Sequence, residues 1–258
     1  MNALTKLAPE TEQDQAPATL GIEIRNLALR FGDTTIFEDL SFDIPGGQFS
    51  ALLGASGVGK TTLLKIVAGL ETPSAGTVRA TDGGPVPGRL AYMGQQDLLY
   101  PWLTVRQNVT LGARLRRERA DKDWADHLLD RVGLADQATA LPLQLSGGMR
   151  QRAAIARTLY EKKPFVLMDE PFSALDAITR ATVQELAAEL LADRTVLLIT
   201  HDPLEACRLG HQLLVLSGRP AVLDPPVRIP GPPPRATDNA DVMHAQAQLL
   251  RRFQELHA

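Results

Sequence analysis

Hydrophobic and polar residues alternate along the first part of the chain, from Ile22 to Ile44. A period of two places successive side chains on opposite faces, as in β-strands that bury one face. Gly32-Asp33 and Pro45-Gly46-Gly47 interrupt the alternation with residues typical of turns. We therefore predict an antiparallel layer of short strands whose apolar face is formed by Ile22, Ile24, Leu27, Leu29, Phe37, Leu40, Phe42 and Ile44.

Short uninterrupted apolar runs follow, at Phe49–Leu53, Leu90–Met93, Phe165–Met168 and Val196–Ile199. Runs of this length bounded by polar residues are typical of strands buried on both faces of a parallel sheet. A helix is predicted directly after the first run, from Lys60 to Leu70. The strand, glycine loop and helix in succession indicate an α/β nucleotide-binding fold.

Helical and polar sequence predominates from Thr104 to Ala140, and Val183, Leu186 and Leu190 recur at the spacing of one helix face. Prolines then cluster between Pro220 and Pro234, which disfavours a central helix or strand there. A last helix is predicted from Asp241 to Leu256, with Val242, Ala245, Leu249, Leu250 and Phe253 on one side. Residues 1–20 are polar and acidic, and we expect a mobile tail.

Composition narrows the class of protein without naming a function. The 258 residues are 44% hydrophobic and 22% charged, and they include a single cysteine, Cys207. No apolar run approaches the roughly 20 residues that a membrane helix needs. The net charge of −3 disfavours a nonspecific nucleic-acid binder. The arginines between Arg114 and Arg119 are interpreted as a solvated helix face, because Glu118, Asp121 and Asp123 offset them.

The clearest chemical motif is a phosphate loop, Gly54–Thr61, which fits G-x-x-x-x-G-K-[ST] and lies between a predicted strand and a predicted helix. Its glycines allow backbone N–H groups to surround phosphate oxygens, and the helix N-terminus adds partial positive charge. Lys60 would contact the β- and γ-phosphates, and the Thr61 hydroxyl would bind Mg²⁺. The predicted nucleotide-binding residues here are Gly54, Ala55, Ser56, Gly57, Val58, Gly59, Lys60, Thr61 and Thr62.

Asp169 and Glu170 end a predicted strand, where acidic residues in α/β folds lie near bound phosphates. Asp169 is suited to hold Mg²⁺, and Glu170 to accept a proton from attacking water. A GTPase would carry a guanine-recognising Asn-Lys-x-Asp segment, and this sequence contains none.

A second candidate anion site, Ser146-Gly147-Gly148, opens a predicted helix within Leu145-Ser-Gly-Gly-Met-Arg-Gln-Arg152. From the phosphate loop through this site to Asp169-Glu170, the order of motifs along the chain resembles that of the ATP-binding cassette family over about residues 21–218. The resemblance implies a P-loop NTPase with a RecA-like α/β core, an antiparallel β subdomain and a helical subdomain inserted at about 100–155. Residues 219–258 would form a proline-rich link and a C-terminal helix outside this domain.

The resemblance also assigns roles to single residues. Phe31 matches the aromatic residue that stacks on adenine, although a place in the core of the β layer is the alternative. Gln95 matches the glutamine that senses Mg²⁺ and water, Asp176 the end of the D-loop at the dimer interface, and His201 the switch histidine near the γ-phosphate. Four other histidines, His127, His211, His244 and His257, receive no role, and Cys207 is expected to pack on a helix.

In this family ATP joins two subunits, and Ser146–Gly148 of one subunit contacts the nucleotide of the other. The resemblance therefore implies a homodimer when ATP is bound, and transmembrane permease subunits that contact Gln96–Val105. The alternative for Leu98, Leu99 and Leu103 is the core, with Trp102 covering them. We also expect a periplasmic or lipoprotein solute-binding protein in the complex, no nucleic acid, and a position on the cytoplasmic face of the cell membrane.

Pro-Trp-Leu-Thr-Val, beginning at Pro101, is similar to the importer ATPases for nitrate, sulfonate, taurine and thiamine precursors. The stretch Ala91–Asp97 most resembles the members for hydroxymethylpyrimidine, a thiamine precursor, which we take as the expected solute. Importers of sulfonate, taurine or nitrate are the alternative. An alternative of a different class is an ABC ATPase that works without a permease. A regulatory β-barrel after Gly218 is disfavoured, because too few residues remain there.

Overall fold

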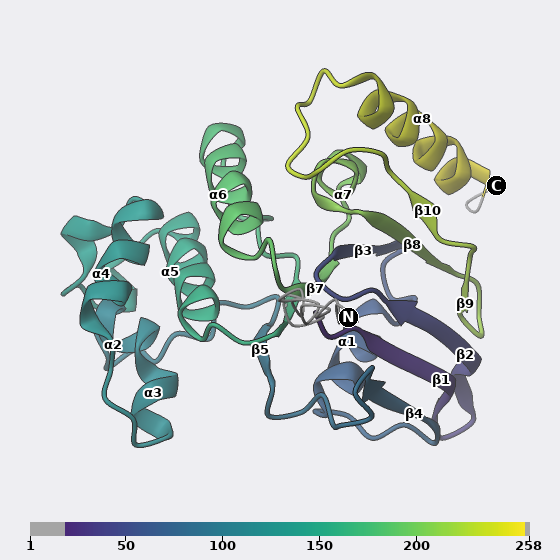
Figure 1. The fold of residues 1–258 in the computed structure, drawn as a ribbon, viewed down its shortest axis with the longest axis horizontal. Coiled ribbons are helices and arrows are strands. Elements are labelled where there is room, and N and C mark those ends of the chain that lie inside the picture. The colour runs from purple at the N-terminus through teal and green to yellow at the C-terminus, as the bar shows by residue number, and fades with distance from the viewer. Residues whose placement is uncertain (1–18, 256–258) are drawn as a thin grey trace, which may run out of the picture.

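The computed structural model describes residues 19–255 (Figure 1). At its centre is a mixed sheet in the order β10-β8-β3-β7-β6-β5, with β9 paired to the free part of β8. Strands β8, β3, β7, β6 and β5 are parallel, and β9 and β10 run antiparallel to β8. The strands are β3 (Phe49–Gly54), β5 (Leu90–Met93), β6 (Phe165–Asp169), β7 (Thr195–Ile199), β8 (Gln212–Ser217), β9 (Val222–Leu223) and β10 (Val227–Arg228).

The four predicted apolar runs are all strands of this sheet, so that part of the prediction is confirmed. Alternate side chains of these strands pack into hydrophobic clusters on opposite faces of the sheet. In β6, Phe165 and Leu167 belong to one cluster, and Val166 and Met168 belong to the other. Burial on both faces explains why the strands carry continuous rather than alternating apolar residues.

A second sheet, antiparallel and in the order β2-β1-β4, forms the separate layer predicted from the alternating pattern. It consists of β1 (Ile22–Phe31), β2 (Thr34–Ile44) and β4 (Ala75–Ala80). All eight predicted apolar positions are buried. They pack against helix α1 (Lys60–Ala68), whose other side meets Leu52, Leu167 and Leu197 of the central sheet. Strand β4 was not predicted, because most of its residues are exposed and its sequence therefore shows no apolar pattern.

Helix α1 ends two residues before the predicted boundary. Gly69 adopts a left-handed conformation with φ of 74°, and its N–H donates to Ile66 O and Lys65 O. This is a common way for a helix to end, since glycine has no Cβ to oppose positive φ.

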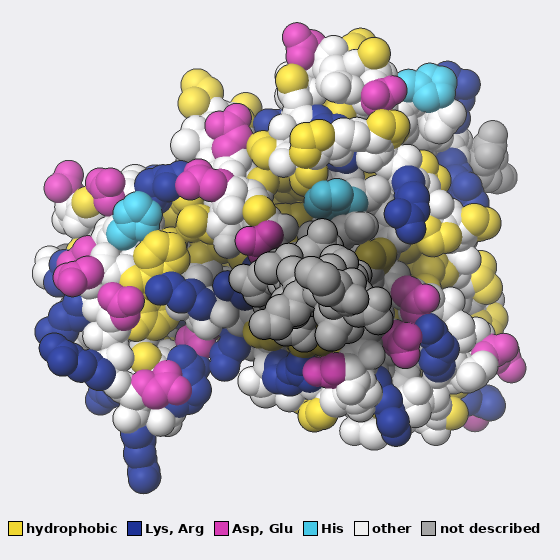
Figure 2. All heavy atoms as spheres, in the orientation of Figure 1, with side chains coloured by type: hydrophobic (Ala, Val, Ile, Leu, Met, Phe, Trp, Pro, Cys, Tyr) yellow, Lys and Arg dark blue, Asp and Glu magenta, His cyan; other side chains and the backbone are white. Residues whose placement is uncertain are grey.

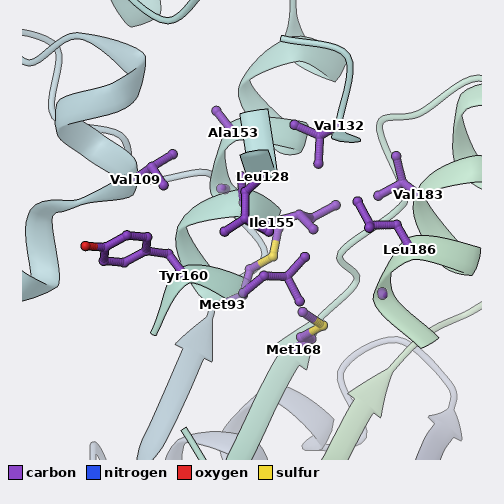
Figure 3. Close-up of a cluster of buried hydrophobic side chains, with 14 of the residues drawn as sticks. Met93, Val109, Leu128, Val132, Ala153, Ile155, Tyr160, Met168, Val183 and Leu186 are labelled. Carbon is purple, nitrogen blue, oxygen red and sulfur yellow. The ribbon is translucent and has the colours of Figure 1, made fainter. Parts of the chain in front are cut away.

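Five α-helices lie between residues 105 and 190, four before β6 and one after it, on one side of the central sheet (Figure 1). They are α2 (Val105–Val109), α3 (Leu111–Leu115), α4 (Lys122–Arg131), α5 (Gly147–Tyr160) and α6 (Ala177–Leu190), with 3-10 turns at Ala135–Gln137 and Pro142–Gln144. Figure 3 shows their shared core, where Leu128 and Ile155 lie near Met93 and Met168 from the ends of β5 and β6. This core fixes α5 to the edge of the sheet.

The arginines between Arg114 and Arg119 are exposed, as a solvated face requires. Arg116 pairs with Glu118 and Glu161. Basic and acidic side chains are interspersed on the face of the molecule shown in Figure 2. The exposure of these arginines and the ion pairs of Arg116 agree with the predicted solvated helix face.

The C-terminal part of the chain packs back on the core. Helix α7 (Pro203–Leu209) and helix α8 (Ala240–Glu255) lie together beside the β8–β10 edge (Figure 1). Val242, Ala245 and Leu249 of α8 are buried as predicted, and Cys207 lies in the same cluster. The prediction was wrong for Leu250, which is 46% exposed, because it lies one position past the buried stripe.

Arg235 fastens the proline-rich link to α7. Its buried guanidinium donates to six backbone carbonyl groups, three at the end of α7 and three in the link, namely Cys207, Arg208, Gly210, Ile229, Pro230 and Gly231. At the other end of the described chain, the carbonyl of Leu20 accepts a hydrogen bond from Thr195. Residues 1–18 of the expected tail, and His257, lie outside the described residues. No helix between residues 19 and 255 is long and apolar enough to span a membrane.

Candidate nucleotide site

A cleft of about 530 Å³ opens at the carboxyl ends of the central strands. This is the edge at which parallel α/β sheets bind ligands. Eleven of the predicted site residues line it together with Ile36: Gly54, Ser56, Gly57, Gly59, Lys60, Thr61, Thr62, Gln95, Asp169, Glu170 and His201. The structure thus brings together side chains from four separate segments of the chain.

The phosphate loop begins where β3 ends, and its glycines are required by geometry. Gly54, Gly57 and Gly59 have φ of 151°, 73° and 111°, a region that other residues rarely adopt. A Cβ at Gly54 would lie 2.3 Å from the carbonyl oxygen of Leu216, and one at Gly59 would meet Phe37 at 2.9 Å. Ala55 is exposed and Val58 is buried, and neither side chain lines the cleft.

The Lys60 ammonium lies within the loop, where it donates to Gly54 O at 2.8 Å and Ala55 O at 2.9 Å. Burial lowers the pKa of Lys60, and the charges of Glu170 and Asp169 partly oppose that effect. A phosphate in the cleft would give this buried cation the anionic partner that favours its charged form.

Thr61 and Asp169 join the phosphate loop to the end of β6, with the hydroxyl donating to Oδ2 at 2.6 Å. Asp169 is 2% exposed, and burial together with the nearby charge of Glu170 raises its pKa, whereas Thr61 and Lys60 lower it. A buried carboxylate beside a hydroxyl is an oxygen donor set suited to Mg²⁺, and a cation there would relieve the cost of burying the charge. The residues present therefore fit this ion.

Glu170 lies between Gln95 and His201. Its Oε2 is 3.5 Å from Gln95 Nε2 and 3.3 Å from His201 Nδ1, so one carboxylate oxygen faces both side chains. His201 is exposed, with 65% of its side chain accessible. Such a carboxylate can accept a proton from water, while the two neighbouring donors orient it.

The backbone of Glu170 has φ of 50°, an uncommon value for a residue with a Cβ. Gln151 of α5 holds this conformation, because its Nε2 donates to Glu170 O at 3.0 Å and Pro171 O at 2.7 Å. Gln151 was not predicted as a site residue, although it lies in the same motif as Ser146. Ile36 was not predicted either, because no sequence pattern distinguishes it.

The signature residues Ser146–Gly148 do not line the cleft of their own chain. Ser146 caps α5 by accepting from Met149 N, and Ser146 and Gly147 are exposed. Asp176 likewise caps α6 by accepting from Thr179 N at 3.0 Å, which lowers its pKa. A Cβ at Gly148 would lie 3.2 Å from Ala174 O, so these two helix starts are neighbours.

Phe31 also lies outside the cleft lining, at the end of β1. It is 51% exposed, so the alternative that placed it in the core of the β layer is wrong. Its side chain is therefore accessible for contact.

The segment after Gln95 divides into exposed and buried residues. Leu98, Tyr100 and Trp102 are 60%, 42% and 70% exposed, and the rings of Tyr100 and Trp102 meet edge to face at 5.3 Å. Leu99 and Leu103 are buried. The core alternative therefore holds for Leu99 and Leu103 but is wrong for Leu98.

Comparisons with known proteins agree with this site. The family model described as ABC transporter matches residues 37–173. The chain is 44% identical to an aliphatic sulfonates import ATP-binding protein, SsuB 1, of Rhodococcus jostii (strain RHA1), over 91% of this chain and 94% of the relative. It is 43% identical to the taurine import ATP-binding protein TauB of Jannaschia sp. (strain CCS1), over 81% of this chain and 82% of the relative.

Solved structures show the same fold. A dimeric ATP-binding cassette in a post-hydrolysis state, bound to ADP and phosphate, superposes with a TM-score of 0.73 and 28% identity. The match covers 81% of this chain and 99% of that structure. An ATP-binding subunit of an ABC transporter gives a TM-score of 0.76 over 92% of this chain, at 23% identity. The predicted fold class, an α/β P-loop NTPase, is thereby confirmed.

Proposed function

Because the chain belongs to the ABC transporter family and hydrolyses ATP, we propose that it is the energy-coupling subunit of a bacterial importer for sulfonate-type solutes. The names of the sulfonate and taurine relatives support this solute class. The observation that carries the proposal is the cleft in which the phosphate loop, Asp169, Glu170, Gln95 and His201 meet.

For hydrolysis, we assign Glu170 as the residue that accepts a proton from the attacking water. Gln95 and His201 lie on either side of its carboxylate and orient the water and the γ-phosphate. Lys60 and the loop N–H groups neutralise phosphate charge. Thr61, Asp169 and Gln95 would hold Mg²⁺, which supplies further charge neutralisation when bound.

The active unit is a homodimer with ATP at its interface. Ser146–Gly148 presents exposed N–H groups at the start of α5 and lies outside the cleft of its own chain. A second copy can supply these groups to the nucleotide, and Asp176 stands beside them at the start of α6. Phe31, exposed at the end of β1, is available to stack on the adenine.

The exposed surface formed by Leu98, Tyr100 and Trp102 is the site we assign to the transmembrane permease. Apolar side chains at this exposure favour a protein partner. The surface is tied to α5, since Asp97 pairs with Arg150 at 3.0 Å and Arg157 donates to Asp97 O and Leu98 O. Movement of the permease would thereby reach the Ser146–Gly148 end of α5.

The complex places this chain on the cytoplasmic face of the membrane, with a solute-binding protein on the other side. Neither relative named above is described as a transporter of hydroxymethylpyrimidine, so that expected solute has no support from them. Nitrate stays an alternative solute within the same group. The alternative function, a soluble ABC ATPase that works without a permease, does not explain why Leu98, Tyr100 and Trp102 are exposed together.

Growth of a strain lacking this chain tests the proposal. We expect it to fail with taurine or an alkanesulfonate as the sulfur source and to grow normally on sulfate. Plasmid-borne wild-type protein should restore growth, and Glu170→Gln should not. Normal growth on sulfonates, with loss of growth on hydroxymethylpyrimidine in thiamine-free medium, would overturn the proposed solute.

A further inference from the structure

A second glutamate, Glu205, lies behind the nucleotide cleft in the first turn of α7 and is 4% exposed. It has no role in the proposed hydrolysis. It follows the switch segment, defined here as Thr200, His201 and Asp202, by three residues. A buried carboxylate this close to a reacting centre is unusual, because burial of a charge is costly unless the charge has hydrogen-bond partners.

Gln184 of α6 is one such partner, and Arg208 fixes the orientation of its side-chain amide. Arg208 Nη1 donates to Gln184 Oε1 at 2.7 Å, and since arginine has no acceptor, this end of the amide must be the oxygen. The Nε2 group then faces Glu205 and donates to Oε2 at 2.9 Å. Arg208 is itself held by Arg235 O at 3.0 Å. Glu205 is therefore the final acceptor in a series of hydrogen bonds that runs from Arg208 through Gln184.

Thr200 is the other neighbour of the carboxylate, and it connects Glu205 to the catalytic groups. The Thr200 hydroxyl accepts from Asp202 N at 3.0 Å, and Thr200 and Glu205 line the same small cavity, where Thr200 lowers the pKa of Glu205. Thr200 is buried, and the next residue is His201, whose Nδ1 faces Glu170. Glu205 thus lies beside Thr200, the residue that directly precedes His201 in the chain.

A cavity of about 40 Å³ joins the two glutamates. Its lining includes Glu170 and His201 on one side and Glu205 and Thr200 on the other. The space is large enough for a water molecule, which needs roughly 10–15 Å³. Glu205 and Glu170 therefore line the same small cavity, together with Phe172 and Arg180.

We propose that Glu205 is a positioning residue for ATP hydrolysis, which acts through Thr200 to hold His201 against Glu170. This inference rests on the proposed role of His201. Without the Glu205 carboxylate, the Gln184 amide loses its buried acceptor, and Thr200 loses the charged group beside it. The switch segment can then adopt other conformations, and the population of molecules with His201 beside Glu170 falls.

A consequence for pH follows from the surroundings of Glu205. Burial raises its pKa to about 7, the charge of Asp202 adds to this, and Thr200, Gln184 and Arg180 oppose it. The other charged or titratable groups around it are Arg208 and Glu185 from the α6–α7 contact, and Glu170 and His201 across the cavity. A protonated Glu205 accepts hydrogen bonds less well, so we expect part of the fall in kcat below pH 7 to come from this residue.

Steady-state hydrolysis by full-length Glu205→Gln and Glu205→Ala tests the proposal. We expect kcat to fall by about tenfold, the size of one lost hydrogen bond, with KM for ATP unchanged because the phosphate loop is untouched. Glu205→Gln retains shape but presents an amide, so it should also lose the part of the pH profile that Glu205 contributes. Glu189→Gln, an exposed glutamate on α6 that pairs with Arg131, is the matched control and should match wild type.

A double-mutant cycle with His201→Ala separates this inference from the proposed function. If Glu205 acts through His201, single-turnover rates of His201→Ala and His201→Ala/Glu205→Gln should agree. Additive losses would overturn the inference, as would wild-type kcat and pH profile in Glu205→Gln. Full activity of His201→Ala alone would instead overturn the assignment of His201. The imidazole NMR signal of His201 gives a check without turnover, and it should shift in Glu205→Gln but not in Glu189→Gln.

Discussion

The Thr61 hydroxyl donates a hydrogen bond of 2.6 Å to Asp169, a residue 108 positions further along the chain. The contact is possible because β3 and β6 are parallel and separated by β7 alone. The phosphate loop and the acidic pair Asp169-Glu170 follow these two strands at the same edge of the sheet.

Glu170→Gln should reduce ATP turnover by at least about 100-fold, since it removes the proposed proton acceptor and retains its size. Nucleotide contacts remain, so ATP should trap the variant as a dimer. Phosphate release measures the first effect and size-exclusion chromatography with ATP the second. A variant that stays monomeric in ATP would contradict the proposed sandwich of two subunits.

Lys60→Ala should reduce hydrolysis by about 100-fold or more and weaken nucleotide binding, because the buried ammonium is lost from the phosphate loop. Isothermal titration with ATP and a turnover assay provide the measurements. Lys122→Ala, an exposed lysine at the start of α4, serves as the control. Turnover of Lys60→Ala at the wild-type rate would rule out the assignment of the loop.

Trp102→Ala should weaken association with the membrane partner and leave ATP binding unchanged. The side chain is 70% exposed, so the melting temperature should stay close to that of wild type. The contrasting variant is Leu103→Ala, which empties a buried site and should cost about 2–5 kcal/mol of unfolding free energy. Unchanged pull-down of the permease by Trp102→Ala would show that the partner binds elsewhere.

Glu205 should make stability depend on pH. Its pKa is about 7 in the folded protein against an ordinary 4.5, so folding disfavours its ionised form. The contribution to stability is fully present below pH 4.5 and is lost as the pH rises through 7. The free energy of unfolding of wild type should therefore fall over this range relative to Glu205→Gln. Urea unfolding at pH 5, 6, 7 and 8 measures the difference, and parallel pH curves would refute it.

Arg235→Ala should lower the free energy of unfolding by about 2–4 kcal/mol, because six backbone carbonyl groups lose a charged donor. Arg228→Ala, exposed on β10, should change stability by no more than about 0.5 kcal/mol. Urea denaturation followed by circular dichroism compares them. Equal stability of the two variants would mean that the proline-rich link is held by other contacts.

Residues close together in the sequence determine the strands, the helices and the phosphate loop of this protein, so these features could be predicted from the sequence alone. The alternation from Ile22 to Ile44 and the continuous apolar runs such as Phe165–Met168 predicted the two kinds of sheet, since burial on one face or two leaves different patterns. The phosphate loop was recognisable because its chemistry requires glycines and Lys60 within a few consecutive residues. These features depend on near neighbours, which the sequence displays directly.

Relations between distant segments were decided by the tertiary structure. Nothing in the sequence indicates that Gln151 holds the backbone of Glu170, or that Arg235 reaches the end of α7. Leu99 and Leu98 are adjacent and chemically alike, yet Leu99 is buried and Leu98 exposed. The raised pKa of Glu205 has the same origin, because its burial and its contacts with Gln184 of α6 and with Thr200 after β7 exist only once these segments pack together.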